Sequence, residues 1–190
     1  MSSHTNDSIV LLGCKHCGKS TQGKLLADYL KSTFYDTDSI IEEISGITPR
    51  LLYAKNGPGA FMQIEEAACK KVFMDNNNKK VIATGGGICS NAPALNELRQ
   101  ANLFVFLRLD INFSVERIVK KIRVLENGTI LNMPAYIADK NPKTIDDVKD
   151  FLFEKYNERF KLYQELSDIT IDLQNVSKEE NLQLIINSIC

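Results

Sequence analysis

The 190-residue chain is predicted to adopt an α/β fold, in which a parallel sheet carries helices on both of its faces. Two observations predict it. Short apolar segments rich in β-branched or aromatic residues alternate along the chain with longer segments of helical periodicity. The first short segment, residues 9–12, runs into a glycine-rich loop and then into a helical pattern, which is the order of a strand, a loop and a helix at the start of a parallel sheet.

Each element follows from its local pattern. Strands are expected at residues 9–12, 33–35, 80–83, 103–107 and 169–171. Helices are expected at residues 19–30, 38–44, 50–55, 60–74, 92–100, 113–121, 144–166 and 178–189. Pro49 suits the first turn of a helix, Gly57-Pro58-Gly59 breaks the helical run, and Asn76-Asn77-Asn78 predicts a turn. Since no repeat and no linker divides the chain, one domain is expected over residues 1–190, with residues 1–8 as a polar, frayed tail.

Composition excludes several classes of protein. The hydrophobic fraction of 44% is enough for a core, and the net charge of -1 provides no field for a nucleic acid or an anionic membrane. No apolar run is long enough to span a bilayer, and the first residues lack a hydrophobic signal segment. Five cysteines without a framework spacing favour a reducing, cytoplasmic setting. Cys14 and Cys17 form a C-x-x-C pair, so zinc or redox chemistry is an alternative, but no second metal-binding pair exists and we favour loop-filling roles.

The glycine-rich loop, Gly13 to Ser20, has the complete P-loop pattern Gly-x-x-x-x-Gly-Lys-Ser. Its backbone N–H groups and the following helix N-terminus are expected to bind the phosphates of ATP. Lys19 would reach the β- and γ-phosphates, and the Ser20 hydroxyl would hold Mg²⁺. The alternative is a glycine-rich turn with a chance lysine. The nucleotide-binding residues are expected to be Gly13, Cys14, Lys15, His16, Cys17, Gly18, Lys19, Ser20 and Thr21.

A pair of carboxylates, Asp36 and Asp38, follows the second expected strand. Ligands of open α/β sheets bind outside the carboxyl ends of the strands, so both side chains should face the crevice that holds the P-loop. Phosphoryl transfer needs a positioned Mg²⁺ and an oriented acceptor hydroxyl. One carboxylate can serve the metal and the other can accept the hydroxyl proton, and their i, i+2 spacing in an extended chain would point both the same way. The alternative is that Asp38 only caps the helix that begins at Ser39.

Two further segments complete the predicted site. Gly85-Gly86-Gly87 follows the strand at residues 80–83, and its backbone N–H groups, free of side chains, are suited to a small polar ligand, although a flexible turn is the alternative. Residues 124–143 lack clear periodicity and are long for a simple connection. We interpret them as a lid that excludes water from the transferred phosphate rather than as an idle insertion.

These motifs, in this order, resemble the shikimate kinase family of P-loop kinases. The resemblance covers the P-loop, Asp36-x-Asp38, Ala83-Thr84-Gly85-Gly86-Gly87 and Arg159-x-x-x-Tyr163 before Asp168, and extends from about Ile9 to Asp172. It implies a three-layer αβα P-loop kinase with a five-stranded parallel sheet and a lid, which transfers the γ-phosphate of ATP to a hydroxyl of shikimate as a monomer.

Carried over by position, the resemblance also implies residue roles. Lys19 and Asp38 would be catalytic, and Ser20 and Asp36 would serve Mg²⁺. The acceptor would be bound by Asp38, Phe61, Gly85, Gly86, Gly87 and Arg159. Arg159 would pair with the carboxylate of shikimate, a role that suits a guanidinium fork. From the residues alone, Arg159 would be interpreted as a solvated helix charge.

The sequence departs from the family pattern at two positions. The family usually has Phe-Arg where this chain has Phe61-Met62, and Arg-Pro in the lid where it has Met133-Pro134. Substitute cations are expected among Arg50, Lys120, Lys121, Arg123 and Lys140. Phosphorylation of shikimate is the leading hypothesis. The alternatives are a kinase of the same fold acting on another small polyol or sugar acid such as gluconate, and a nucleotide-binding protein without catalysis.

Overall fold

The computed structural model describes residues 7–75 and 79–189, and over these residues the expected α/β architecture is confirmed. A five-stranded parallel sheet has the order β2-β3-β1-β4-β7. Its strands are β1 (Ile9–Leu12), β2 (Thr33–Asp36), β3 (Lys80–Ala83), β4 (Leu103–Leu109) and β7 (Ile169–Leu173). All five begin where the sequence predicts, and β2, β4 and β7 run one or two residues longer, so the strand pattern was readable from the chain.

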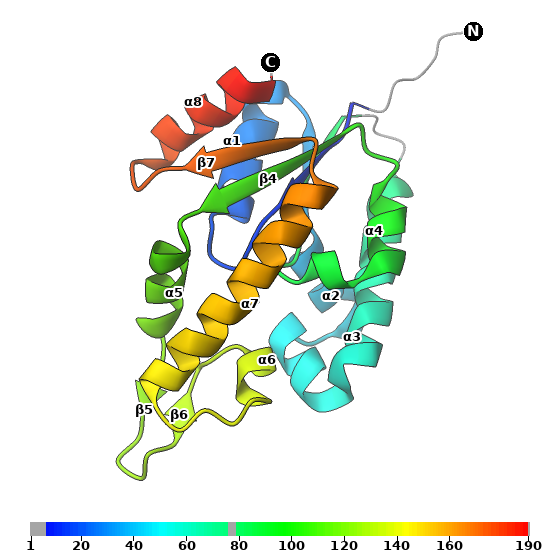
Figure 1. Cartoon of the computed structure of the whole chain (residues 1–190). Coiled ribbons are helices and arrows are strands. Elements are labelled where there is room, and N and C mark those ends of the chain that lie inside the picture. Colours follow the sequence, from blue (N-terminus) through cyan, green and yellow to red (C-terminus); the bar gives the residue numbers. More distant parts are fainter. Residues whose placement is uncertain (1–6, 76–78, 190) are drawn as a thin grey trace, which may run out of the picture.

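Helices connect the strands and cover the sheet (Figure 1). They are α1 (Lys19–Leu30), α2 (Thr37–Ser45), α3 (Pro49–Phe73), α4 (Ala92–Leu98), α5 (Ile111–Val119), α6 (Ala135–Ala138), α7 (Ile145–Leu166) and α8 (Lys178–Ile189), with a 3₁₀ turn at Ile88–Ser90. None of these helices combines the length and the apolar character that crossing a membrane requires, in the part of the chain that the structure describes.

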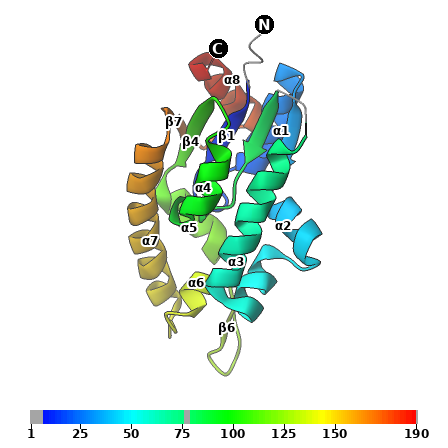
Figure 2. The same cartoon turned by 90° about the vertical axis from the view of Figure 1, so that its right-hand side faces the viewer.

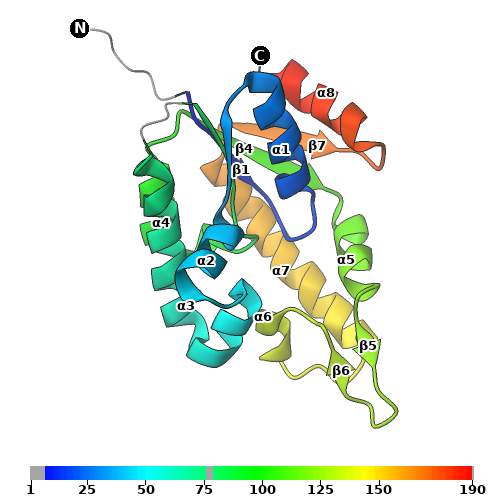
Figure 3. The same ribbon diagram turned by 180° about the vertical axis from the view of Figure 1, so that it is seen from behind.

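The two faces of the sheet have separate cores because alternate residues of each strand point to opposite sides. On β1, Val10 and Leu12 belong to the larger core, which α3, α4 and α7 cover, whereas Ile9 and Leu11 belong to the smaller core under α1 and α8. Figure 3 shows α1 and α8 side by side on that second face, and Figure 2 shows α3, α4 and α7 over the other. All four residues of β1 are buried, as expected for the central strand of a doubly covered sheet.

Helix α3 is interrupted where the sequence predicts a break. Thr48 caps it, Pro49 occupies its first turn, and Gly57 leaves the helical region with φ 78° and ψ 174°. Gly57 therefore redirects the chain between two helical halves, and the second half packs Ala68 and Val72 into the core. The bend lets both halves of α3 contribute side chains to one pocket.

Several helices, α2, α4, α5 and α7, begin or end one or two residues from the expected positions, and two expected segments differ further. The frayed tail predicted for residues 1–8 is wrong at Ser8, which is fully buried because its carbonyl accepts hydrogen bonds from the N–H groups of Asn102 and Leu103. The predicted lid contains a β-hairpin, β5 (Arg123–Val124) with β6 (Ile130–Leu131), and then α6, which projects this segment from the sheet (Figures 1 and 3). The turn predicted at residues 76–78 lies outside the described residues.

Candidate active site

The predicted site segments meet at the carboxyl ends of three adjacent strands. The P-loop joins β1 to α1, Asp36 ends β2, and Gly85 follows β3 by two residues. Beside them lies a pocket of about 420 Å³, walled by both halves of α3, the α6 segment and the middle of α7. Asp38, Phe61, Gly86, Gly87 and Arg159 line it, so five of the six predicted acceptor residues face one cavity.

The P-loop has the backbone that its glycines predict. Gly13 has φ 149°, and a Cβ there would lie 2.7 Å from the carbonyl oxygen of Leu107. Gly18 caps α1 with φ 110°, a conformation that L side chains rarely adopt. The Lys19 ammonium lies inside the curve of the loop, where it donates to the carbonyl oxygens of Gly13 (2.8 Å) and Cys14 (3.0 Å). A lysine held at this point carries positive charge where phosphates are expected.

The two loop cysteines are free, and both are buried. Burial raises the pKa of the Cys14 thiol to about 12, so this thiol is neutral at physiological pH. Among the residues that the structure describes, no group of three or more His, Cys, Asp or Glu side chains is placed to hold a metal ion. This environment favours the loop-filling interpretation of the C-x-x-C pair.

Asp36 joins the P-loop to the second strand. Its Oδ2 accepts a hydrogen bond from the Ser20 hydroxyl at 2.5 Å, and its Oδ1 accepts one from the backbone N–H of Asp38 at 3.0 Å. Asp36 is thus the N-cap of α2, so the alternative that Asp38 caps this helix is wrong. Because the helix begins at Thr37, the two carboxylates do not share the direction expected of an extended chain. Asp36 faces Ser20, and Asp38 faces the pocket.

Asp38 has an environment suited to a proton acceptor. Solvent reaches it through the pocket, yet the surrounding protein raises the pKa of its carboxyl. The nearby Asp36 charge raises this pKa further, while the ammonium groups of Lys19 and Lys15 oppose the shift. A carboxylate with a raised pKa beside the phosphate-binding lysine is appropriate for accepting a proton from a hydroxyl.

The three consecutive glycines permit close packing rather than an unusual turn, since none of them has a positive φ. A Cβ on Gly86 would lie 2.7 Å from the backbone nitrogen of Lys15, and one on Gly87 would lie 3.3 Å from Nη2 of Arg159. Gly85 does not line the pocket, and its N–H donates to the Thr37 hydroxyl at 3.0 Å. The expectation that all three N–H groups are available to a ligand is therefore wrong at Gly85.

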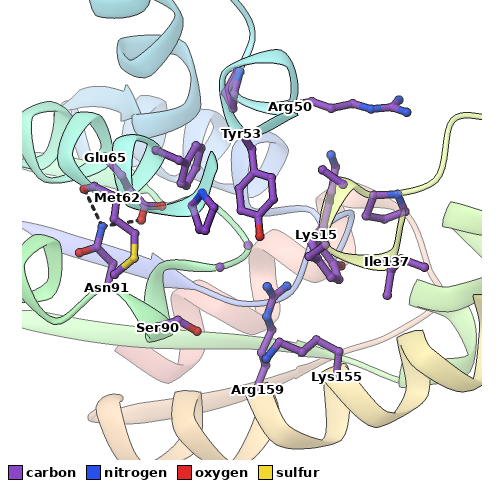
Figure 4. Close-up of a pocket in the computed structure, with 18 of the residues that line it drawn as sticks. Lys15, Arg50, Tyr53, Met62, Glu65, Ser90, Asn91, Ile137, Lys155 and Arg159 are labelled. Atoms are coloured by element: carbon purple, nitrogen blue, oxygen red, sulfur yellow. Dashed lines mark hydrogen bonds between the residues drawn. The ribbon is translucent and has the colours of Figure 1, made fainter. Parts of the chain in front are cut away.

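Arg159 is not the solvated helix charge that its position alone suggests. Its side chain is 7% exposed and lies over the ring of Tyr136, with Cζ 4.6 Å from the ring centroid. Figure 4 shows it reaching from α7 into the pocket, toward Tyr53 of α3. No described carboxylate forms a salt bridge with it, and its Nε donates to no described atom. A buried, unpaired guanidinium in a pocket is suited to an anionic ligand.

The expected substitute cations fall into two groups. Arg50 and Lys140 line the pocket, whereas Lys120 and Arg123 do not. Burial is the main cause that lowers the pKa of His16, and the charge of Lys121 lowers it further. Lys121 therefore lies near the P-loop. Arg117, which the sequence did not single out, donates to the carbonyl oxygen of His16 at 3.0 Å and ties α5 to the loop. Cations are thus present on both the acceptor side and the nucleotide side.

The two methionines of the altered motifs have different surroundings. Met62 lines the pocket, while Met133 packs against the larger core and is outside the pocket lining. Phe61 lines the pocket and also packs against the larger core. Its ring meets that of Tyr53 edge to face, with the ring centroids 5.9 Å apart. The departure at Met62 therefore changes the pocket wall directly, and the one at Met133 does not.

Most other pocket residues were missed as acceptor residues by the sequence analysis, among them Lys15, Tyr53, Glu65 and Tyr136. Lys15 was assigned to the nucleotide, but its side chain lines the acceptor pocket, where the surrounding protein lowers its pKa and Asp38 opposes the shift. Glu65 had a signal, since it follows Phe61 and Met62 by one helical turn and so shares their face.

Comparisons with known proteins agree with this geometry. A family model described as shikimate kinase matches residues 15–190. A shikimate kinase of Caldanaerobacter subterraneus subsp. tengcongensis is 31% identical over 165 residues, which cover 78% of this chain and 95% of that protein. One of Clostridium botulinum strain Loch Maree is 29% identical over 182 residues, covering 96% of this chain and 95% of the relative. The solved shikimate kinase from Acinetobacter baumannii in complex with shikimate superposes with a TM-score of 0.75 at 25% identity, covering 95% of this chain and 91% of that one.

Proposed function

The chain belongs to the shikimate kinase family of ATP-dependent kinases that phosphorylate an alcohol group, and we propose that its own acceptor is shikimate. Relatives named shikimate kinase match most of the chain, and one solved relative is described in complex with shikimate. The product would be shikimate 3-phosphate, an intermediate of aromatic amino-acid biosynthesis in this family.

One observation carries the proposal: Arg159, a buried guanidinium with no acidic partner among the described residues, lies in the same pocket as Asp38. Shikimate has a carboxylate and hydroxyls on one small ring, so it can occupy both groups at once. The carboxylate would pair with Arg159, with the Lys15 ammonium of the P-loop as a second cation on the pocket wall. Lys15 would thereby compensate for the apolar Met62, since losing one partner of a desolvated charge pair otherwise costs about 2–5 kcal/mol.

The residues present can perform the transfer. Asp38 would accept the proton of the reacting hydroxyl as its oxygen forms a bond to the γ-phosphorus of ATP. The bond from that phosphorus to the β,γ-bridging oxygen breaks, and ADP leaves. Lys19 would stabilise the charge that develops on the phosphoryl oxygens, from the position in the loop described above.

The family uses ATP with a divalent metal ion, and we propose Mg²⁺ here. The Ser20 hydroxyl and the Asp36 carboxylate, which are hydrogen-bonded to each other, are hard oxygen donors of the kind that Mg²⁺ prefers. Bound there with ATP, the ion would neutralise phosphate charge. Ser20 would hold it directly, and Asp36 would orient Ser20 and the water around the ion.

A second acceptor class is favoured by Met62. An apolar side chain on the pocket wall is compatible with a neutral polyol or with a sugar acid such as gluconate, held by Arg159 alone. A protein that binds nucleotide without turnover is less well supported, because Lys19, Asp38 and Arg159 are all retained at one site.

The test is ADP release with Mg-ATP and shikimate, measured beside gluconate and a series of neutral polyols. Saturable turnover with shikimate, lost in Arg159→Ala but not in Arg99→Ala at the exposed C-cap of α4, is the expected result. Turnover with gluconate or a neutral polyol, but not with shikimate, would mean that the acceptor belongs to the second class. Nucleotide binding without turnover for any acceptor would leave the protein a nucleotide-binding one.

Three further expectations accompany this proposal. We propose one domain with a lid at residues 124–143, because this segment projects from the sheet (Figure 1) and its α6 part lines the pocket. We also propose a monomer, which size-exclusion chromatography with light scattering would test. A reducing cytoplasmic location is in keeping with the free cysteines.

A further inference from the structure

One carboxyl group in the pocket has an oxygen that no protein atom uses. Glu65 of α3 lines the pocket and is 2% exposed. Its Oε2 accepts a hydrogen bond from Nδ2 of Asn91 at 2.8 Å, whereas its Oε1 accepts none from any residue that the structure describes. Figure 4 shows Glu65 and Asn91 together at one end of the pocket, with Met62 beside them. Since buried polar atoms are nearly always hydrogen-bonded, this oxygen indicates a ligand atom as its partner.

The same oxygen lies beside the carboxylate that faces the reacting hydroxyl. A Cβ built on Gly85 would be 3.0 Å from Oε1 of Glu65 and also 3.0 Å from Oδ1 of Asp38. Oxygens from two different helices, α2 and α3, therefore converge on a single point. Two neighbouring hydroxyls on one small ring would then donate to the two carboxyl groups at once.

No described cation forms an ion pair with the buried Glu65. Met62, one turn earlier on the same helix face, is apolar, and no described salt bridge includes Glu65. Burial raises the pKa of the Glu65 carboxyl to about 7. The Asn91 hydrogen bond opposes this shift, the Asp38 charge adds to it, and Arg159 opposes it. Close to neutral pH the group is thus partly ionised, and in the ionised form Oε1 is an acceptor for a hydroxyl proton.

We propose that Glu65 is a specificity-determining residue of the acceptor pocket, whose Oε1 accepts a hydrogen bond from a second acceptor hydroxyl while Asp38 faces the hydroxyl that is phosphorylated. The inference rests on the proposed acceptor site and extends it. It restricts the acceptor to molecules that carry two neighbouring hydroxyls at the end of the molecule away from the anionic group bound by Arg159. A monohydroxy acid of the same size should be a poor substrate.

The test compares Glu65→Gln with Glu66→Gln, a matched control one residue along the same helix and outside the pocket lining. In Glu65→Gln the amide oxygen can keep the Asn91 hydrogen bond, and the amide then presents an N–H donor where Oε1 was. KM and kcat would be measured with shikimate and with deoxy analogues that each lack one hydroxyl. We expect KM for shikimate to rise about 10- to 100-fold in Glu65→Gln, the usual effect of losing a hydrogen bond to a charged group. KM for ATP and all constants of Glu66→Gln should stay unchanged.

One deoxy analogue distinguishes binding from a structural role. The analogue that lacks the hydroxyl bound by Glu65 should have the same KM with the wild type and with Glu65→Gln, whereas the other analogues should retain the difference. An equal increase for every analogue, together with a lower melting temperature, would mean a structural carboxyl and would overturn the inference. So would an unchanged KM for shikimate.

Failure of the proposed acceptor gives a different result. If the wild type phosphorylates another acceptor and not shikimate, the acceptor assignment fails, and Glu65→Gln is then compared with the wild type on that acceptor and its deoxy forms. An unchanged KM there overturns the inference separately. If no acceptor is phosphorylated and calorimetry detects no acceptor binding to the wild type, both fail.

Discussion

Replacement of Gly86 by alanine tests whether close packing between the glycine segment and the P-loop determines activity. The new Cβ would lie 2.7 Å from the backbone nitrogen of Lys15 and 3.1 Å from its Cα. Ordinary contact begins at 3.4 Å, so one of the two backbone segments must move by about 0.7 Å. Neither can yield by rotating a side chain, because the close atoms belong to the main chain.

The size of the effect follows from which segments move. Overpacking of this kind costs about 1–3 kcal/mol of unfolding free energy. Catalysis should suffer more, because the P-loop positions ATP and the glycine segment lines the acceptor pocket, and a displacement approaching 1 Å between reacting groups can cost about 10²-fold in rate. We therefore expect Gly86→Ala to fold, with kcat about 10²-fold lower and with KM raised for both substrates.

The assay is steady-state ADP release with varied ATP and varied acceptor, together with urea unfolding. Gly59→Ala is the control, because a Cβ at Gly59 meets nothing within 4 Å and Gly59 has no positive φ. It should retain full activity and gain up to about 1 kcal/mol of stability from the restricted unfolded chain. Wild-type kinetics in Gly86→Ala would refute the claim that this contact sets the geometry of the site.

Three other changes have defined outcomes. Lys19→Ala should abolish ADP release and leave the circular dichroism spectrum intact, and undiminished turnover would remove the P-loop assignment. Asp38→Asn should lower kcat by about 10²-fold or more with little change in KM for ATP, whereas an unchanged kcat would exclude a proton-accepting role. Burial raises the pKa of Glu65 from 4.5 to about 7, so the folded protein holds this proton more tightly than the unfolded chain does. As the pH rises from 4.5 to 7, the wild type should therefore lose about 3 kcal/mol of unfolding free energy relative to Glu65→Gln. Urea titrations at pH 5 and pH 8 measure the difference, and parallel pH profiles for the two proteins would contradict it.

Local signals predicted the fold well. The P-loop pattern and the apolar residues before it located β1 and the start and end of α1 without error, because both depend on adjacent residues. Gly57 was recognised as a break because glycine preceding proline disfavours a continuous helix. The hairpin at β5 and β6 was missed although Asn127-Gly128 is a turn signal, and Gly128 indeed has φ 81°. Its two-residue strands were too short to show alternation.

The acceptor pocket was less predictable, because its residues come together only through long-range packing. The burial of Arg159 depends on Tyr136, which is 23 positions away in sequence and belongs to a different helix. The division of roles between Asp36 and Asp38 depended on which residue begins α2, and the pattern there fits either. Glu65 alone had a usable signal in its helical spacing from Met62. Sequence patterns thus located the segments, and packing determined which side chains face the ligand.

Lys15 belongs to both halves of the site. Its main chain is in contact with Gly86, its carbonyl oxygen accepts a hydrogen bond from the Tyr156 hydroxyl at 3.4 Å, and its side chain lines the acceptor pocket. Any adjustment of the loop around ATP must therefore shift a wall of the other cavity. By thermodynamic reciprocity, the factor by which ATP changes the dissociation constant of the acceptor equals the factor by which the acceptor changes that of ATP. Mutual synergy between ATP and the acceptor is the kinetic signature of such a shared residue, and truncating Lys15 should reduce this synergy as well as weaken acceptor binding.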